Sequence, residues 1–149
     1  MAVDCRLEAD PFDPAVELAA FLRGRAHEGA VVSFTGLVRG DPGDSLTVQA
    51  YPGLTERTLR QIAEDACARF SVPDVLIVHR HGRMNPGEPI VFVAAASAHR
   101  RDAFEAADYL MDRLKTDAAF WKHQDGPQGA RWIEPTHADR DARSRWRTP

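Results

Sequence analysis

The stretch SAHRRDAFEAADYLMDRLKTDAAFWK, residues 97–122, decides how we expect this 149-residue chain to fold. At 100° per residue its apolar side chains form one helical stripe, and its acidic side chains fall opposite. The stripe consists of Ala103, Ala107, Leu110, Met111, Leu114 and Ala118. The pattern predicts an amphipathic helix with Lys115 at its border, and Lys122 about two turns later if the helix continues.

Lys115 and Lys122 are the only lysines of the chain, against seventeen arginines. Arginine keeps its proton near neutral pH, whereas a desolvated lysine can lose it and act as a nucleophile or base. Two surface lysines without a role are the alternative. Their clustering beside Phe120 and Trp121 favours a catalytic pair.

A second candidate site lies just before the predicted helix. Ser97, His99 and Arg100 follow the apolar run 90–96, so they lie where a strand would lead into the helix. Free backbone amides at a helix start, beside a histidine and an arginine, predict an anion site. The alternative is that Ser97 caps the helix while His99 and Arg100 are solvated.

Composition limits the classes of function. A hydrophobic content of 44% over residues 1–149 predicts one domain with its own core, and residues 133–149 read as a polar C-terminal tail. The formal charge of −3 argues against nucleic-acid binding. No apolar run approaches bilayer length and the N-terminus is acidic, so we expect a cytoplasmic protein. Cys5 and Cys67 lack metal or disulfide spacing, and we expect no metal site.

The predicted elements run strand, helix, strand, strand, helix, strand, strand, helix, strand, which indicates an α+β domain with a mostly antiparallel or mixed sheet. The predicted strands cover residues 2–7, 30–39, 46–51, 75–80, 90–96 and 130–133. Residues 30–39 are β-rich and suggest a central strand. Arg39 ends that strand before the turn-rich loop 40–45, where it is either a phosphate ligand or an ordinary surface arginine.

Five motifs occur in one order between residues 30 and 132: FTGLVRG (34–40), YPGLTE (51–56), HRHGRMNPGE (79–88), SAHR (97–100) and LKTDAAFWK (114–122). In these motifs the chain resembles the large, catalytic subunit of molybdopterin synthase. The resemblance implies an α/β-hammerhead fold, a homodimer, and a small ubiquitin-like sulfur-carrier subunit at each end, giving a heterotetramer.

The resemblance also implies a reaction of molybdenum cofactor biosynthesis. The carrier's C-terminal Gly-Gly thiocarboxylate would enter a pocket of this chain and act as the sulfur donor. Two sulfur atoms would pass in sequence to cyclic pyranopterin monophosphate, forming the dithiolene of molybdopterin. This sulfurtransferase needs no cofactor of its own.

Site residues carry over by position within the motifs. Lys115 is favoured as the catalytic group and Lys122 as its electrostatic partner, although the roles could be exchanged. The expected substrate-binding residues are Leu37, Val38, Arg39, His99, Arg100, Lys115, Lys122, His123 and Gln124. Leu37, Ala50 and Gln124 depart from residues common in the family, which bears on substrate affinity and the pocket rim. The competing interpretation is a non-catalytic α+β module that binds a phosphate or nucleotide.

Overall fold

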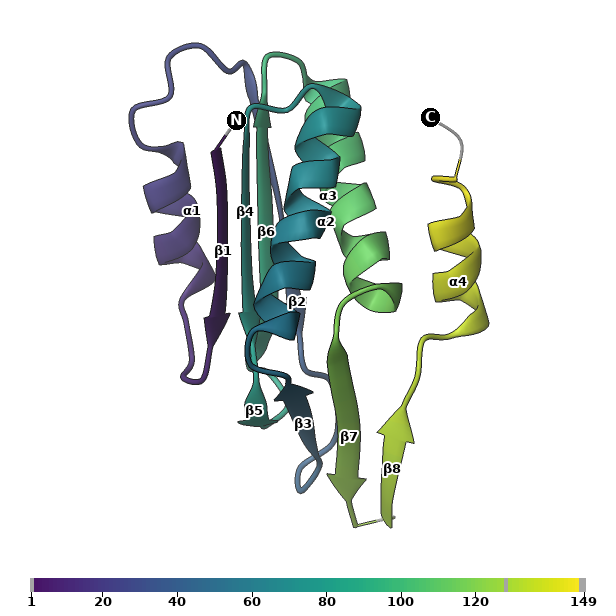
Figure 1. Ribbon diagram of the computed structural model, residues 1–149. Coiled ribbons are helices and arrows are strands. Elements are labelled where there is room, and N and C mark those ends of the chain that lie inside the picture. The colour runs from purple at the N-terminus through teal and green to yellow at the C-terminus, as the bar shows by residue number, and fades with distance from the viewer. Residues whose placement is uncertain (1, 128, 148–149) are drawn as a thin grey trace.

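The computed structural model describes residues 2–127 and 129–147. Its larger sheet, sheet A, has the strand order β1-β4-β6-β2 (Figure 1). The strands are β1 (Ala2–Glu8), β4 (Asp74–Arg80), β6 (Pro89–Ser97) and β2 (Ala30–Leu37). β1 runs parallel to β4, and the other two pairs are antiparallel. The predicted α+β fold with a mixed sheet is confirmed.

The core lies on both faces of β4 and β6, because successive side chains of a strand point to opposite faces. One face, including Ile77 and Val93, packs against helices α2 (Leu54–Phe70) and α3 (Arg100–Thr116). The other face, including Phe92, packs against residues of and around α1 (Pro14–Leu22). Asp13 caps α1 by accepting a hydrogen bond from the Ala15 amide at 2.9 Å.

A second sheet, sheet B, extends beyond one end of sheet A and carries the order β5-β3-β7-β8 (Figure 1). Its strands are β5 (Gly82–Met84), β3 (Ser45–Ala50), β7 (Phe120–Gly126) and β8 (Gly129–Ile133). All its pairs are antiparallel. Sheet B joins segments on either side of α3, so it gathers residues far apart in the sequence.

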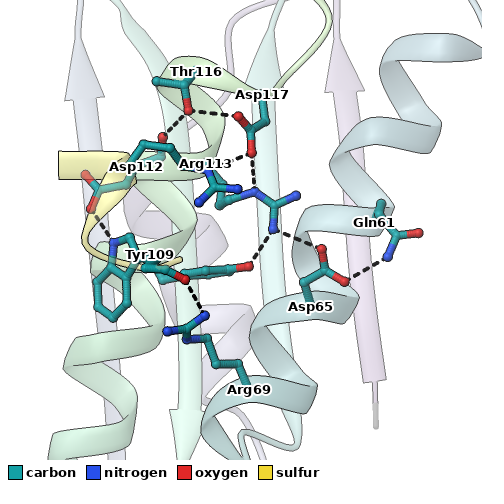
Figure 2. A network of polar contacts seen from close by, with 10 residues as sticks. Gln61, Asp65, Arg69, Tyr109, Asp112, Arg113, Thr116 and Asp117 are labelled. Atoms are coloured by element: carbon teal, nitrogen blue, oxygen red, sulfur yellow. Dashed lines mark hydrogen bonds and ion pairs between the residues drawn. The ribbon is translucent and has the colours of Figure 1, made fainter. Parts of the chain in front are cut away.

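The C-terminal segment is folded rather than a loose polar tail. It contains α4 (His137–Ser144), and Trp146 then packs edge-on against Phe70 and Tyr109, with ring centroids 5.5 Å apart in both pairs. The Trp146 indole N–H donates to Asp112 at 2.6 Å (Figure 2). Residues 134–147 are therefore anchored on α2 and α3, whereas residues 148–149 of the predicted tail lie outside the described residues.

One sequence-based prediction of element placement is wrong, and the condition attached to another is not met. β2 is an edge strand of sheet A, not a central one, because β-rich composition predicts a strand without fixing its neighbours. Helix α3 ends at Thr116, where Asp117 accepts from Arg113 at 2.5 Å, so Lys122 lies on strand β7 instead of two helical turns beyond Lys115. Figure 2 shows Arg113 also donating to Asp65 at 2.9 Å, which ties α3 to α2.

Helices long and apolar enough to cross a membrane are absent from residues 2–127 and 129–147.

Candidate active site

A pocket of about 700 Å³ lies where the end of β2 and the end of α3 meet sheet B. We call it the lysine pocket. Its lining includes Arg39, Lys115, Lys122, Gln124 and Arg131. An adjoining hollow of about 450 Å³ shares Arg39 and both lysines. Four cationic side chains from four segments thus converge on one volume.

Alternation along β7 explains why Lys122 points into the pocket. Lys122 and Gln124 share one face of the strand, and Trp121 and His123 share the other. The start of β7 is fixed by Thr55, a fully buried side chain at the start of α2 whose hydroxyl donates to the Ala119 carbonyl at 2.6 Å. The position of Lys122 therefore depends on an anchor in a distant helix.

The two lysines differ in their surroundings. Lys115, in the last turn of α3, is exposed, whereas Lys122 is partly enclosed by the pocket walls. Burial, and after it repulsion from Lys115, lower the pKa of Lys122 to about 8, with Asp139 partly opposing both effects. A lysine with this pKa is present in part as the neutral amine near physiological pH, and a neutral amine can accept a proton or attack a carbonyl.

A buried histidine packs against Phe120, the first residue of the strand that carries Lys122. His79, at the end of β4, is 4% exposed and stacks on Phe120 with ring centroids 4.1 Å apart. Burial, with smaller contributions from Lys122 and Lys115, lowers the pKa of His79 to about 3, although a hydrogen bond to the Arg80 carbonyl opposes this. His79 is therefore neutral at physiological pH, with Nδ1 donating to that carbonyl at 2.7 Å.

The remaining cations suit an anionic ligand. Arg131 on β8 donates to the Gln124 side chain at 3.3 Å, which ties the two strands across the pocket. Within the described residues, no hydrogen bond or ion pair holds the Arg39 guanidinium. Arginine presents several donors in a planar fork, and this geometry matches phosphate oxygens.

Most of the predicted site residues come together in this pocket. They are Leu37, Val38, Arg39, Lys115, Lys122 and Gln124. His123 points to the opposite face of β7, where its ring lies 4.8 Å from that of Trp132 and its Nδ1 lies 3.3 Å from Asp125.

His99 and Arg100 lie apart from the lysine pocket within one chain. His99 is the N-cap residue of α3, and Arg100 begins the helix. Fifteen residues separate Arg100 from Lys115, which corresponds to about 22 Å along the helix. Both side chains are exposed at the end of α3 away from sheet B (Figure 1).

Part of the pocket wall comes from residues that were not predicted as site residues. Glu134, Thr136 and Asp139 border the two lysines from the segment leading into α4. Their signal was the pattern Thr136-x-x-Asp139, a capping box in which each side chain accepts from the other residue's amide. This pattern predicts a helix start at Thr136, and the fold brings that start beside the lysines.

In the described part of the chain, no group of three or more histidine, cysteine, aspartate or glutamate side chains could hold a metal ion.

Comparison with known proteins decides the family. The family model described as MoaE protein matches residues 7–117, about three quarters of the chain. The chain belongs to the MoaE family. It is 54% identical over 142 residues to the molybdopterin synthase catalytic subunit of Caulobacter vibrioides, which covers 94% of this chain and 95% of that protein.

Solved structures agree with the MoaE assignment. The molybdopterin biosynthesis MoaE protein of Burkholderia ambifaria superimposes with a TM-score of 0.84 at 41% identity, covering all of both chains. The complex of subunits 1 and 2 of molybdopterin-converting factor from Helicobacter pylori shares the fold, with a TM-score of 0.72 at 18% identity over 89% of this chain and 90% of that one. This MoaE chain is a molybdopterin synthase catalytic subunit, an enzyme of molybdenum cofactor biosynthesis that adds sulfur to a pterin. The non-catalytic binding module is not favoured.

Proposed function

We propose that the lysine pocket receives the C-terminal thiocarboxylate of a small ubiquitin-like carrier subunit and transfers its sulfur to cyclic pyranopterin monophosphate. The observation that carries this proposal is the pairing of an exposed Lys115 with an enclosed Lys122 of lowered pKa, beside Arg39. The Helicobacter pylori relative, a complex of two subunits, supports a small-subunit partner.

The chemistry follows from the charges of the pocket. The thiocarboxylate sulfur forms a C–S bond to a side-chain carbon of the pterin, the C–O bond at that carbon breaks, and its oxygen leaves as water or stays on the opened phosphate. Water then cleaves the acyl–sulfur bond, so sulfur stays on the pterin and the carrier leaves with a carboxylate. Lys115, at the pocket mouth, stabilises the negative charge on the acyl group. Lys122 accepts the proton from the attacking water, and Arg39 holds the phosphate.

A homodimer would reconcile the positions of His99 and Arg100 with a role in substrate binding. These side chains cannot reach the lysine pocket of their own chain, but they are exposed and could enter that of a second copy. Two copies of this chain with two carriers form the proposed heterotetramer.

Reconstitution tests the function. The purified chain is mixed with thiocarboxylated carrier and cyclic pyranopterin monophosphate, and molybdopterin is measured as its fluorescent oxidation product. Lys115→Ala and Lys122→Ala should each lower turnover at least about 100-fold, the usual range for a lost acid–base or charged group. Arg60→Ala, which removes an exposed cation of α2, is the control and should retain activity. Undiminished turnover in both lysine variants would refute the proposed roles.

The same assay tests the shared site. Lys122→Ala and Arg100→Ala chains are each inactive alone under the proposal, but a mixed dimer has one pocket with both residues intact. Mixing the two variants under conditions of subunit exchange should therefore restore product. Absence of restoration despite exchange would show that Arg100 does not act across a dimer.

A further inference from the structure

Arg80 is a buried cation that the reaction proposed above does not use. It ends β4 next to His79, is 3% exposed, and does not line the lysine pocket. Its guanidinium donates to Glu88 at 3.1 Å and to the Ala9 carbonyl at 3.3 Å. Its Nε–H has no hydrogen-bond partner among the described residues.

A buried arginine with an unpaired donor contributes little net stability to the fold. Removing a guanidinium from water is costly, and the cost is repaid only when every donor finds a partner. One donor of Arg80 does not. We therefore ask which part of the backbone the hydrogen-bond partners of Arg80 hold in place.

Glu88, the acidic partner, closes a tight turn. Its other carboxylate oxygen accepts from the Asn85 amide at 2.5 Å, and its own amide donates to the Asn85 carbonyl at 3.2 Å. The Asn85 hydrogen bond, followed by that from Arg80, lowers the pKa of Glu88, so the carboxylate is charged at neutral pH. Gly87 supplies the left-handed backbone, with φ of +93°, that the turn requires.

The turn 85–88 is hydrogen-bonded to Val38, the residue before Arg39. The Val38 amide donates to the Glu88 carbonyl at 2.9 Å, and the Gly87 amide donates to the Val38 carbonyl at 2.7 Å. Both backbone polar groups of the buried Val38 are thus bound to residues 85–88. The next residue is Arg39, whose own side chain lacks such a restraint in the described structure.

We propose that Arg80 is a positioning residue for Arg39, acting through Glu88 and the turn 85–88 to fix where the backbone of Val38 delivers Arg39 to the lysine pocket. The inference rests on the proposed function, in which Arg39 binds the substrate phosphate. A displacement of about 1 Å at such a donor weakens binding strongly. An effect on substrate binding at retained stability is what separates positioning from a merely structural role.

The test uses Arg80→Met and Glu88→Gln, with Arg25→Met as matched control. Arg25 forms a comparable part-buried ion pair with Asp74, at the opposite end of β4, and lies 3.1 Å from Glu28. Two quantities are measured on the full chain: hydrogen exchange of the Val38 and Gly87 amides, and KM for cyclic pyranopterin monophosphate in the reconstituted reaction. Both variants should speed exchange and raise KM about tenfold with kcat nearly unchanged. Arg25→Met should alter neither.

An additional variant guards against loss of folding. If Arg80→Met does not fold, Glu88→Gln and Arg80→Lys carry the test, since Glu88 is partly exposed and lysine keeps one charged donor. On an Arg39→Ala background, Arg80→Met should add little to the rise in KM, because the group it positions is already gone.

The outcomes separate the two proposals. Unchanged exchange at Val38 and Gly87 would overturn the physical link, and faster exchange with unchanged KM would overturn the positioning role. If the wild-type chain makes no product, the proposed function fails by itself. Exchange and the affinity for inorganic phosphate, measured by calorimetry, then decide whether Arg80 positions an anion site.

Discussion

The two sheets of this protein differ in how deeply the residues of their inner strands are buried. In sheet A, every residue from Val91 to Ser97 of β6 is buried, and the neighbouring β4 is buried from Val75 to Arg80. In sheet B, no residue of β7 or β8 is fully buried. Because packing supplies most of the stability, sheet A holds the fold. Within sheet B, β3 and β5 contribute Val48 and Met84 to a small buried apolar cluster, whereas β7 and β8 stay accessible to ligands and rely on polar anchors such as that between Thr55 and Ala119.

The largest expected contrast between the sheets is in core truncation. Phe92 of sheet A is 1% exposed, so Phe92→Ala should lower the free energy of unfolding by about 3–5 kcal/mol. Trp132 of sheet B is 60% exposed, and Trp132→Ala should cost less than about 1 kcal/mol. Urea denaturation of both variants measures the difference. Equal losses would contradict the division of labour between the sheets.

The junction of the sheets should respond to acid. The folded-state pKa of His79, about 3, lies below the ordinary histidine value of 6.5. Between these values the unfolded chain binds a proton that the native state excludes, so stability falls as the pH falls. The loss between pH 6.5 and 4 should reach about 3 kcal/mol.

His79→Phe keeps the stacking on Phe120 and should flatten this pH dependence, as followed by urea denaturation at several pH values. His137→Phe replaces an exposed histidine and serves as the control. An unaltered slope in the His79 variant would assign the acid sensitivity to other groups.

The smallest expected effect concerns the pocket itself. The pKa of Lys122 in the folded protein, about 8, lies below the ordinary lysine value of 10.5, so its charged form opposes folding at neutral pH. A pKa shift of this size corresponds to about 3 kcal/mol, and the solvent that still reaches the half-buried ammonium lowers that cost, so Lys122→Met should raise the free energy of unfolding by about 1–2 kcal/mol at pH 7. The gain should shrink as the pH rises from 8 and vanish above 10.5.

Thermal or urea unfolding of wild type and variant, compared pair by pair at each pH, checks this expectation. Arg60→Met, an exposed change on α2, is the control. A variant less stable than wild type at pH 7 would mean that the Lys122 ammonium is well solvated or paired.

The sequence predicts sheet A and its helices well for a physical reason. α2 and α3 are long and periodic, and β4 and β6 are continuous apolar runs, so the pattern repeats often enough to identify each. β7 escapes prediction because both of its faces carry polar side chains: Lys122 and Gln124 on one, His123 on the other. No alternation of apolar and polar residues marks it as a strand.

α4 escapes prediction for a related reason. It is short, polar and without a buried residue. Its position is fixed by contacts with distant residues, such as Arg143 donating to Asp117 at 2.9 Å and Trp146 packing on Phe70. Such contacts join elements that a local pattern cannot relate.

The residues of the candidate site also fall into those that the sequence points to and those that only the folded structure reveals. The scarcity of lysine singled out Lys115 and Lys122 from composition alone, and the structure brings both into one pocket. The roles of Arg80 and Glu88 depend on hydrogen bonds to Val38 and Asn85, which no residue pattern announces. The separation of Arg100 from Lys115, by contrast, follows from the predicted helix, because fifteen residues at 1.5 Å each span about 22 Å.

Inserting or deleting residues in helix α3 should disturb the protein more than substituting residues on the solvent-facing side of that helix. A substitution on its solvent face leaves both ends where they are. One inserted residue would rotate Lys115 by 100° relative to Arg100 and advance it by about 1.5 Å. Four inserted residues would nearly restore the rotation but displace one end by about 6 Å. Under the proposed function the number of residues in α3 is therefore more tightly constrained than its solvent-facing side chains, apart from Asp108 and Asp112, which hold Arg145 and Trp146.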